Sequence, residues 1–274
     1  MTQPSPLLPG DGFNELAVCR HGSMLFNRND QYIGASLRKY GEFSAGESIL
    51  FRQIVSPGMT VLEIGANIGA HTVELSRLAG PGGVVHAFEP QRLMFQLLCA
   101  NLALNSLANV FAYQKAVGET RAVARIPALD PTRLTNFGGV SLRPDGPGED
   151  VQVLRIDDYD LPACHLMKID VEGMELPALR GARETIRRLR PLLYVENDRD
   201  AHSRALIGLL LEFGYRLYWH LPLLFSPDNF RGDPENIFAD TVSINLLCLP
   251  AERAHNVTGF REVSGPDDDW RRLG

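Results

Sequence analysis

The sequence lacks the features that mark several large classes of protein. Nowhere in its 274 residues is there an apolar run of about 18, the length that a membrane-spanning helix needs. The N-terminus has neither the basic start nor the apolar core of a signal peptide. The four cysteines are scattered and form no C-x-x-C pair or zinc spacing. We therefore expect a cytoplasmic protein with reduced thiols and no membrane span.

Positive charge is also in short supply. The chain carries 27 Lys and Arg against 33 Asp and Glu, a formal net charge of −6, whereas binding to nucleic acid needs a basic surface. The arginines between residues 183 and 190 are interpreted as one solvated helix face. We expect no nucleic-acid partner. With 45% apolar and 22% charged residues, the composition is that of a globular protein with an ample core.

The stretch 60–72, TVLEIGANIGAHT, organises the rest of the chain. An apolar run, Val61–Ile64, leads directly into Gly65, Asn67 and Gly69, and a helical pattern follows over residues 70–79. A strand that ends at glycines and turns into a helix is typical of nucleotide-binding proteins, because glycine lets the backbone approach a ligand. The alternative is a tight strand–helix turn that binds nothing.

The spacing within this turn argues against a dinucleotide, because the G-x-G-x-x-G fingerprint is missing. The turn reads E-x-G-x-N-x-G, with Glu63 before the first glycine. It resembles motif I of S-adenosylmethionine-dependent methyltransferases. A carboxylate there would repel a pyrophosphate, but it would attract an ammonium or a sulfonium group.

The pattern downstream predicts alternating strands and helices. We expect strands over residues 84–88, 109–113, 165–170, 191–196, 215–219 and 241–249, and helices over 91–105, 171–189 and 201–213. In the helix over 91–105 the expected core residues are Met94, Leu97, Leu98 and Leu102. Upstream, a helix beginning at Ser44 or Gly46 is expected to bury Ile49, Leu50, Gln53 and Ile54, and short strands are expected over 13–32.

This alternation predicts an α/β fold, a Rossmann-like doubly wound sheet that is mostly parallel with an antiparallel C-terminal strand. We divide the chain into an N-terminal cap and cofactor-covering segment (1–50), a main domain (51–250) and a C-terminal tail (251–274). The main domain is expected to hold a strand-rich insertion near 120–156 and a substrate loop near 220–240.

Acids end three of the expected strands, at Glu63, Glu89 and Asp170, and Glu196 ends a fourth. The carboxyl ends of parallel strands gather at one edge of a sheet, which is where ligands bind. Glu89 ends the strand after the glycine turn, where an acid commonly accepts hydrogen bonds from ribose hydroxyls. The alternative for Glu89 is an acid that only caps the next helix.

Five separated motifs, in this order, resemble the FkbM family of methyltransferases. They are Tyr40-Gly41-Glu42, Glu63–Gly69, Phe88-Glu89-Pro90, Asn101–Asn105 and Lys168–Glu175. The resemblance covers about residues 37–197. Glu63 departs from the pattern, since many members carry Asp there, but the longer acid keeps the charge. The resemblance implies a class I methyltransferase fold, S-adenosylmethionine as methyl donor, and usually O-methylation of sugar hydroxyls or small natural products.

We expect S-adenosylmethionine to be bound by residues of these motifs and of the loop after the third strand. They are Tyr40, Glu42, Glu63, Gly65, Ala66, Asn67, Gly69, Glu89, Pro90, Lys115, Ala116 and Asp170. The segment 40–42 is expected to close over the cofactor.

Methyl transfer needs the two partners in line and a group that takes the hydroxyl proton. The candidates are Asp170, Glu172 and His202. The alternatives are that Glu172 only complements a helix dipole and that His202 is a surface residue at a helix start. An acceptor pocket could be built from Trp219, His220 and Asn229. The alternative is that these residues belong to an ordinary packed loop.

A metal ion is a separate hypothesis. Asp170, Asn197 and Asp198 follow neighbouring expected strands, and their hard oxygen ligands suit Mg²⁺. The alternative is that Asp170 contacts cofactor and acceptor directly while the other two begin a turn. We do not include a metal in the expected site.

The leading hypothesis is an O-methyltransferase acting on a sugar or small natural product. A non-catalytic nucleotide-binding module, an N-methyltransferase of a small amine and a nicotinamide-dependent oxidoreductase are the alternatives. The expected partner is the acceptor molecule itself, and a homodimer is left open.

Overall fold

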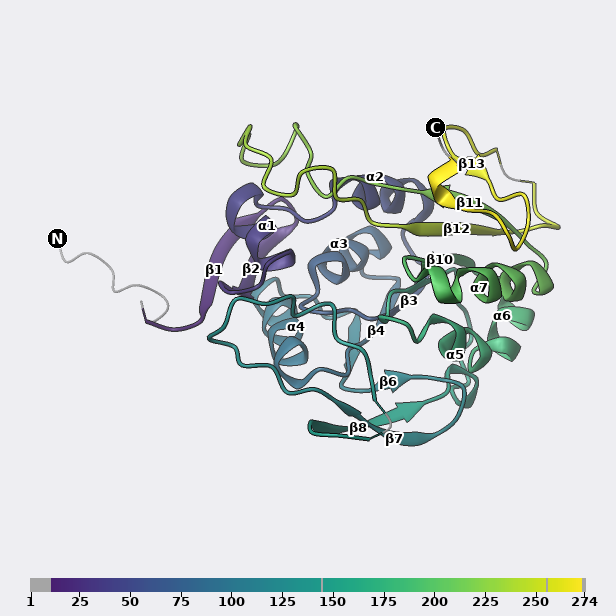
Figure 1. Cartoon of the computed structure of the whole chain (residues 1–274), viewed down its shortest axis with the longest axis horizontal. Coiled ribbons are helices and arrows are strands. Elements are labelled where there is room, and N and C mark those ends of the chain that lie inside the picture. Colours follow the sequence, from purple (N-terminus) through teal and green to yellow (C-terminus); the bar gives the residue numbers. More distant parts are fainter. Residues whose placement is uncertain (1–10, 144, 255, 273–274) are drawn as a thin grey trace.

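An eight-stranded sheet runs through the centre of the protein (Figure 1). The computed structural model describes residues 11–143, 145–254 and 256–272. The strand order is β13-β11-β12-β10-β9-β3-β4-β5. The parallel strands are β3 (Thr60–Ile64), β4 (Val84–Phe88), β5 (Val110–Tyr113), β9 (Leu166–Ile169) and β10 (Leu192–Glu196). The antiparallel strands are β11 (Tyr215–His220), β12 (Asn245–Pro250) and β13 (Arg261–Glu262). The predicted mostly parallel sheet is confirmed.

Helices cover both faces of this sheet. One face packs against α2 (Ala45–Ile54), α3 (Ala70–Ala79) and α4 (Arg92–Leu104). The other packs against α5 (Glu175–Arg180), α6 (Arg183–Leu189) and α7 (Asp200–Glu212). Because buried parallel strands are apolar on both sides, two cores form, one on each face. The predicted core residues of α4 are all buried: Met94, Leu97, Leu98 and Leu102.

A hairpin of β1 (Asn14–Cys19) and β2 (Gly22–Asn27), followed by α1 (Ile33–Tyr40), lies beside α4 (Figure 1). Two asparagines of α4 fasten it. The Asn101 amide accepts from the Leu25 N–H at 2.6 Å and donates to the Ile68 carbonyl at 2.8 Å, and the Asn105 amide donates to the Ser23 carbonyl at 2.7 Å. The bonds to Leu25 and Ser23 pair backbone N–H and C=O groups of the edge strand β2 that have no partner strand. The NLALN motif therefore connects the N-terminal hairpin to the glycine turn.

The strand-rich insertion forms a second sheet, seen along the lower edge of Figure 1. Its order is β6 (Ala116–Val117), β8 (Glu149–Leu154), β7 (Ala122–Ile126). A short 3₁₀ turn, η1 (Ile156–Asp158), follows β8, and another, η2 (Trp270–Arg272), lies near the C-terminus. Part of residues 114–118, expected to be a loop, is β6 and pairs parallel with β8.

Three elements differ from the expectation. The single helix predicted over 171–189 is two, α5 and α6, with a turn at residues 181–182 between them. A Cβ on Gly181 would lie 1.9 Å from the Gly118 carbonyl oxygen, so this turn requires glycine. In α2 the buried residues are Glu47, Ser48, Leu50 and Phe51, while Ile49 is 52% exposed. The buried face of the helix is therefore rotated relative to the predicted apolar stripe. The apolar pattern did not reveal this face, because it includes the charged residue Glu47. Helix α1 was not predicted.

Among the described residues, no helix has the length and apolar character to cross a bilayer. The four cysteines are unpaired; Cys99 is exposed and the others are buried. Of the expected terminal segments, residues 1–10 and 273–274 lie outside the described residues.

Candidate active site

The ends of the parallel strands place two rows of side chains next to each other. Strand pairing aligns the first row, which is Glu63 of β3, Lys168 of β9 and Tyr194 of β10. Two residues farther along these strands comes the second row, which is Gly65, Asp170 and Glu196. Because alternate residues of a strand point to the same side, both rows project from the face that α2 and α3 cover.

Gly65 makes a gap in the second row. Its φ is +89°, and a Cβ would lie 1.7 Å from the Asp170 carbonyl oxygen, so no other residue fits without movement of the backbone. Asn67 follows with a φ of +50°, a left-handed conformation that asparagine tolerates. The gap leaves open space between Glu89 and Asp170, and two cavities meet there.

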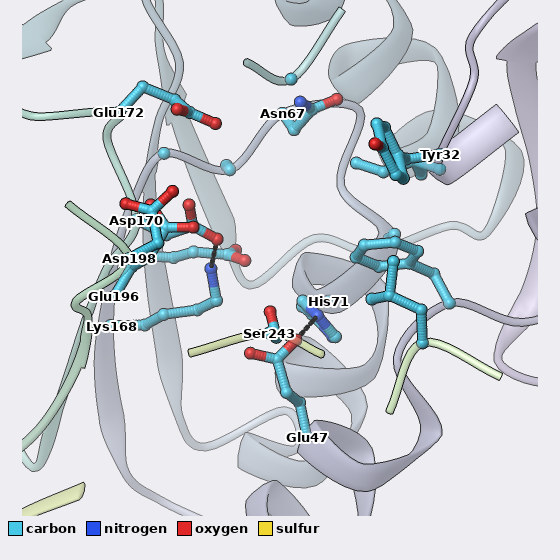
Figure 2. A pocket seen from close by; sticks show the side chains of 18 of the residues that line it. Tyr32, Glu47, Asn67, His71, Lys168, Asp170, Glu172, Glu196, Asp198 and Ser243 are labelled. Carbon is cyan, nitrogen blue, oxygen red and sulfur yellow. Dashed lines mark hydrogen bonds and ion pairs between the residues drawn. The ribbon is translucent and has the colours of Figure 1, made fainter. Parts of the chain in front are cut away.

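The larger cavity measures about 240 Å³ and is strongly acidic (Figure 2). Its acidic residues are Glu47, Glu63, Glu89, Asp170, Glu172, Glu196 and Asp198. The cationic side chains that line it are Lys168 and His71. Apolar groups form another part of the wall: Tyr32, Ile33, Phe43, Leu224, Val242 and Ile244. The cavity therefore suits a ligand that carries positive charge and has an apolar part.

The smaller cavity is a narrow apolar slot of about 40 Å³. Its wall includes Phe88, Pro90, Lys115, Ala116, Ile126, Val140 and Met174. It shares Gly65, Asn67, Glu89, Gly138 and Glu172 with the larger cavity. One ligand could therefore occupy both, with a flat apolar group in the slot and a charged group in the acidic cavity.

Glu89 stands where the two cavities meet. Its carboxylate accepts hydrogen bonds from the backbone N–H of Asn67 at 2.8 Å and from that of Gln91 at 2.7 Å. Burial raises the pKa of Glu89 to about 7, although both backbone N–H groups oppose the shift. Each oxygen keeps a further lone pair, so the side chain can accept bonds from ligand hydroxyls.

Glu63 lies deeper in the same cavity. Its carboxylate accepts a hydrogen bond from the Thr72 hydroxyl at 2.6 Å, which joins β3 to the first turn of α3. Burial raises the pKa of Glu63, and the Lys168 ammonium opposes that shift. The side chain is thus held beside the cavity by the helix that follows the glycine turn.

A buried polar network, not predicted from the sequence, lies below these acids. Glu47 and His71 form an ion pair at 2.8 Å, and the Tyr194 hydroxyl donates to Glu47 at 3.1 Å. Burial alone would raise the pKa of Glu47, but the His71 charge outweighs it and the net pKa falls to about 2. Burial would lower the pKa of His71, yet Glu47 raises it. The two side chains therefore hold each other charged.

Lys168 is a further cavity residue that was not predicted from the sequence. Its ammonium donates to Asp170 at 2.9 Å, and its side chain is 2% exposed. One signal was present, because a lysine within the apolar run LMKI is rarely buried without a charged partner. Glu47 and His71 left no comparable signal, since each comes from a helix whose cavity-facing side only the tertiary structure defines.

An acidic cluster lies at the rim of the cavity. One carboxylate oxygen each of Glu172, Glu196 and Asp198 lies within 4.8 Å of the others. Arg199 forms ion pairs with Glu172 and with Asp198. Burial, with the Asp170 charge added, raises the pKa of Glu172 to about 7.

This cluster differs from the predicted magnesium ligands. It contains Asp198, but the oxygens grouped with that residue come from Glu172 and Glu196. The Asn197 amide nitrogen instead donates to the Ser203 hydroxyl at 2.9 Å. Asp170 is paired with Lys168.

Four of the predicted site residues line neither cavity: Tyr40, Glu42, Gly69 and His202. Tyr40 is 1% exposed; its hydroxyl donates to the Glu235 carbonyl at 2.8 Å and accepts from the Ile237 N–H at 2.9 Å. Glu42 pairs with Arg20 and accepts from the Phe230 N–H at 3.2 Å. The segment 40–42 thus anchors the loop 224–240, and its predicted direct contact with the cofactor is not supported by this geometry.

The other two have equally local roles. Gly69 precedes α3 with a φ of +84°, and a Cβ there would lie 2.7 Å from the Leu98 side chain, so it makes room for α4. His202 is exposed on α7. Trp219, His220 and Asn229 also lie outside the cavities, and Asn229 bonds only within its own loop. The packed-loop interpretation therefore fits Asn229, whereas Trp219 and His220 are buried residues of strand β11.

The nine other predicted cofactor residues line one or both cavities. They are Glu63, Gly65, Ala66, Asn67, Glu89, Pro90, Lys115, Ala116 and Asp170. Asp170 and Glu172, the remaining catalytic candidates, line the acidic cavity. The structure thus brings together residues of three motifs, and of the loop after the third expected strand, that are far apart in the sequence.

Comparison with known proteins points to a methyltransferase family. The family model described as "Methyltransferase FkbM domain" matches residues 63–217, more than half of the chain. The 31-O-demethyl-FK506 methyltransferase FkbM of Streptomyces tacrolimicus is 28% identical over an alignment of 204 residues, and the match covers 62% of this chain and 77% of that protein. Methyltransferase 1 of Beauveria bassiana (strain ARSEF 2860) is 27% identical over 143 residues, 44% of this chain and 57% of that protein.

Solved structures are also similar. Methyltransferase FkbM from Methylobacillus flagellatus KT shares 19% identity with a TM-score of 0.47, and the match covers 80% of this chain and 55% of that one. A SAM-dependent O-methyltransferase from Thermotoga maritima shares 14% identity with a TM-score of 0.47, over 89% of this chain and 80% of that one. The chain spans little more than half of the Methylobacillus protein.

Proposed function

Because the chain belongs to the FkbM methyltransferase family, we propose that it transfers a methyl group from S-adenosylmethionine to a hydroxyl of a sugar or small natural product. The observation that carries this proposal is the continuity of the apolar slot and the acidic cavity past Gly65. S-adenosylmethionine has a flat adenine, a ribose diol and a cationic end, in that order. The two cavities offer matching surroundings in the same order.

The residues present fit that cofactor. Pro90, Lys115 and Ala116 line the slot that would hold the adenine. Glu89, at the junction, would accept hydrogen bonds from the ribose hydroxyls. Glu63 and Asp170 flank the Gly65 gap, where their charges would stabilise the sulfonium and the ammonium. Gly65 itself lines both cavities at their junction.

When bound, S-adenosylmethionine supplies an electrophilic methyl group. The chain's own contribution begins with position, because Asp170 directly follows the central strand β9 and lines the acidic cavity. Glu172 lies beside it with a pKa raised to about 7 by burial. A carboxylate with that pKa is matched to accept a hydroxyl proton near neutral pH. We assign orientation of the acceptor to Asp170 and proton acceptance to Glu172.

The charge of the cavity favours oxygen over nitrogen as the methyl acceptor. Carboxylates stabilise the protonated form of a nearby amine, and a protonated amine has no lone pair for attack. A hydroxyl stays neutral and can donate its proton to Glu172. The apolar wall formed by Tyr32, Phe43 and Leu224 supports an acceptor with an apolar body, as in the relative named for 31-O-demethyl-FK506.

The test is a methyl-transfer screen with labelled S-adenosylmethionine over sugars, polyketides and amines. Labelled product on a hydroxyl compound, accompanied by S-adenosylhomocysteine, is the expected result. Label found only on amines would show that the protein is an N-methyltransferase and not an O-methyltransferase. Binding of the cofactor without turnover on any acceptor class would favour a non-catalytic module.

A further inference from the structure

Lys168 has hydrogen-bonding capacity that the protein does not use. Its ammonium carries three N–H donors, and among the described residues Asp170 is its single hydrogen-bond acceptor. The side chain is 2% exposed and its end faces the acidic cavity (Figure 2). Burial alone would lower the pKa of this ammonium, but Asp170 and Glu47 outweigh it and raise the pKa. A buried cation with open donors is stabilised by a further oxygen ligand.

His71 reaches the same cavity from another element. It lies in the first turn of α3, where its ring is paired with Glu47 at 2.8 Å. Lys168 is close enough to oppose protonation of His71. Two like charges that face one cavity repel each other, and an anion placed between them relieves that repulsion.

The start of α3 adds a third favourable feature. Its N-cap is Gly69, which offers no side-chain cap. The first backbone N–H groups of a helix lack partners within the helix, and the dipole there attracts negative charge. Ala70 and His71, both in this turn, line the cavity.

We infer that Lys168 and His71, with the first turn of α3, bind the α-carboxylate of the cofactor's methionine end. This inference rests on the proposed use of S-adenosylmethionine. The carboxylate is the one anionic group of that molecule, and the many acids of the cavity would repel it. Lys168 and His71 are the cationic side chains that line the cavity, so they are where that carboxylate can be accepted. Asp170 and Glu47 then act as the partners that hold the two cations in place.

Decarboxylated S-adenosylmethionine, which lacks only this carboxylate, separates binding of the carboxylate from a structural role. Titration calorimetry would compare it with S-adenosylmethionine on the full chain. We expect the wild-type protein to prefer S-adenosylmethionine. Lys168→Met should weaken S-adenosylmethionine about 10- to 100-fold. The same variant should bind the decarboxylated compound as well as the wild type does, or more tightly.

Two further variants complete the design. His71→Gln, on a different element, should show the same selective loss if Lys168→Met fails to fold. Lys115 is the other lysine that lines the cavities, and it lies at the slot. Lys115→Met should therefore change the affinities for S-adenosylmethionine and for its decarboxylated form by the same factor. Binding of 5′-methylthioadenosine, which has no methionine end, reports whether the slot is intact in each variant.

Two outcomes would overturn the inference, and a third would refute the proposed function. A wild-type protein that binds both compounds equally has no site for the carboxylate. A Lys168→Met or His71→Gln protein that still binds 5′-methylthioadenosine, but loses affinity for both compounds by the same factor, shows that the residue does not act on the carboxylate. A wild-type protein that binds neither compound nor methylthioadenosine would instead refute the proposed function, which is a distinguishable result.

Discussion

Gly65 and Asp170 are in such close contact that a single added carbon on Gly65 would lie 1.7 Å from the Asp170 carbonyl oxygen. This contact brings the end of β9 against the glycine turn after β3. It places Asp170 beside the passage between the two cavities. The relationship links the turn that would hold the cofactor to the residue that would orient the acceptor.

Gly65→Ala should therefore destabilise the protein. The φ of +89° and the overlap with backbone atoms together should lower the free energy of unfolding by on the order of 3 kcal/mol. Urea unfolding would measure it. Gly208→Ala is the matched control, because no atom lies near that Cβ and the residue is inside α7; it should stabilise by about 0.5–1 kcal/mol. Equal effects of the two changes would contradict the close contact.

Glu89→Ala should weaken binding of S-adenosylmethionine by about 1.5–3 kcal/mol, because hydrogen bonds from the ribose to a charged acceptor are lost. Titration calorimetry would measure the affinity. Glu149→Ala, which removes an exposed partner of Arg92, serves as the control and should leave the affinity unchanged. Unchanged affinity in Glu89→Ala would show that Glu89 does not bind the ribose hydroxyls.

Glu89 should also make stability depend on pH. Its pKa is raised from 4.5 to about 7 in the folded protein, mainly by burial. The folded state then holds the proton more tightly than the unfolded chain, so this contribution is present below pH 4.5 and is lost as the pH rises through 7. Glu89→Gln removes the titration. The difference in unfolding free energy between this variant and the wild type should therefore grow in favour of the variant by about 3 kcal/mol as the pH rises from roughly 5 to 8. A constant difference across that range would show that Glu89 is not the group responsible.

Glu172→Gln should lower kcat by about 10²- to 10⁴-fold while S-adenosylmethionine still binds, because proton acceptance is lost and the cofactor contacts remain. His202→Ala should retain full activity, since that histidine is exposed on α7 and lines neither cavity. Steady-state kinetics on an acceptor found by the screen would measure both. The reverse pattern, with His202 essential and Glu172 dispensable, would restore the histidine as the base.

Activity should survive exhaustive chelation. Arg199 already pairs with Glu172 and Asp198, so the acidic cluster at the rim has a cation of its own. The measurement is turnover before and after chelation, with Mg²⁺ added back. If activity is lost and Mg²⁺ restores it, a metal would replace Glu172 in activating the hydroxyl. An inactive Asp198→Ala protein that still binds cofactor would then place the ion at the cluster.

Local patterns were enough to predict the sheet, because strand and helix periodicity, together with glycine at positive φ, depend on neighbouring residues. The predicted helix over 70–79 is α3 (Ala70–Ala79), and the predicted strand over 84–88 is β4 (Val84–Phe88). The acids Glu63, Glu89 and Asp170 could be placed together because parallel strands end at one edge. Their position follows from topology alone.

Only the tertiary structure decided which other side chains meet those acids. Glu47 faces the cavity because of the rotation of α2, which depends on its packing against β-strands far away in the sequence. Tyr40 and Glu42 anchor the loop 224–240, whose partners lie near the other end of the chain. Lys168 is charged in a buried strand because Asp170, Glu47 and Glu63 surround it. Burial and long-range charge are properties of the assembled fold, so no local pattern could contain them.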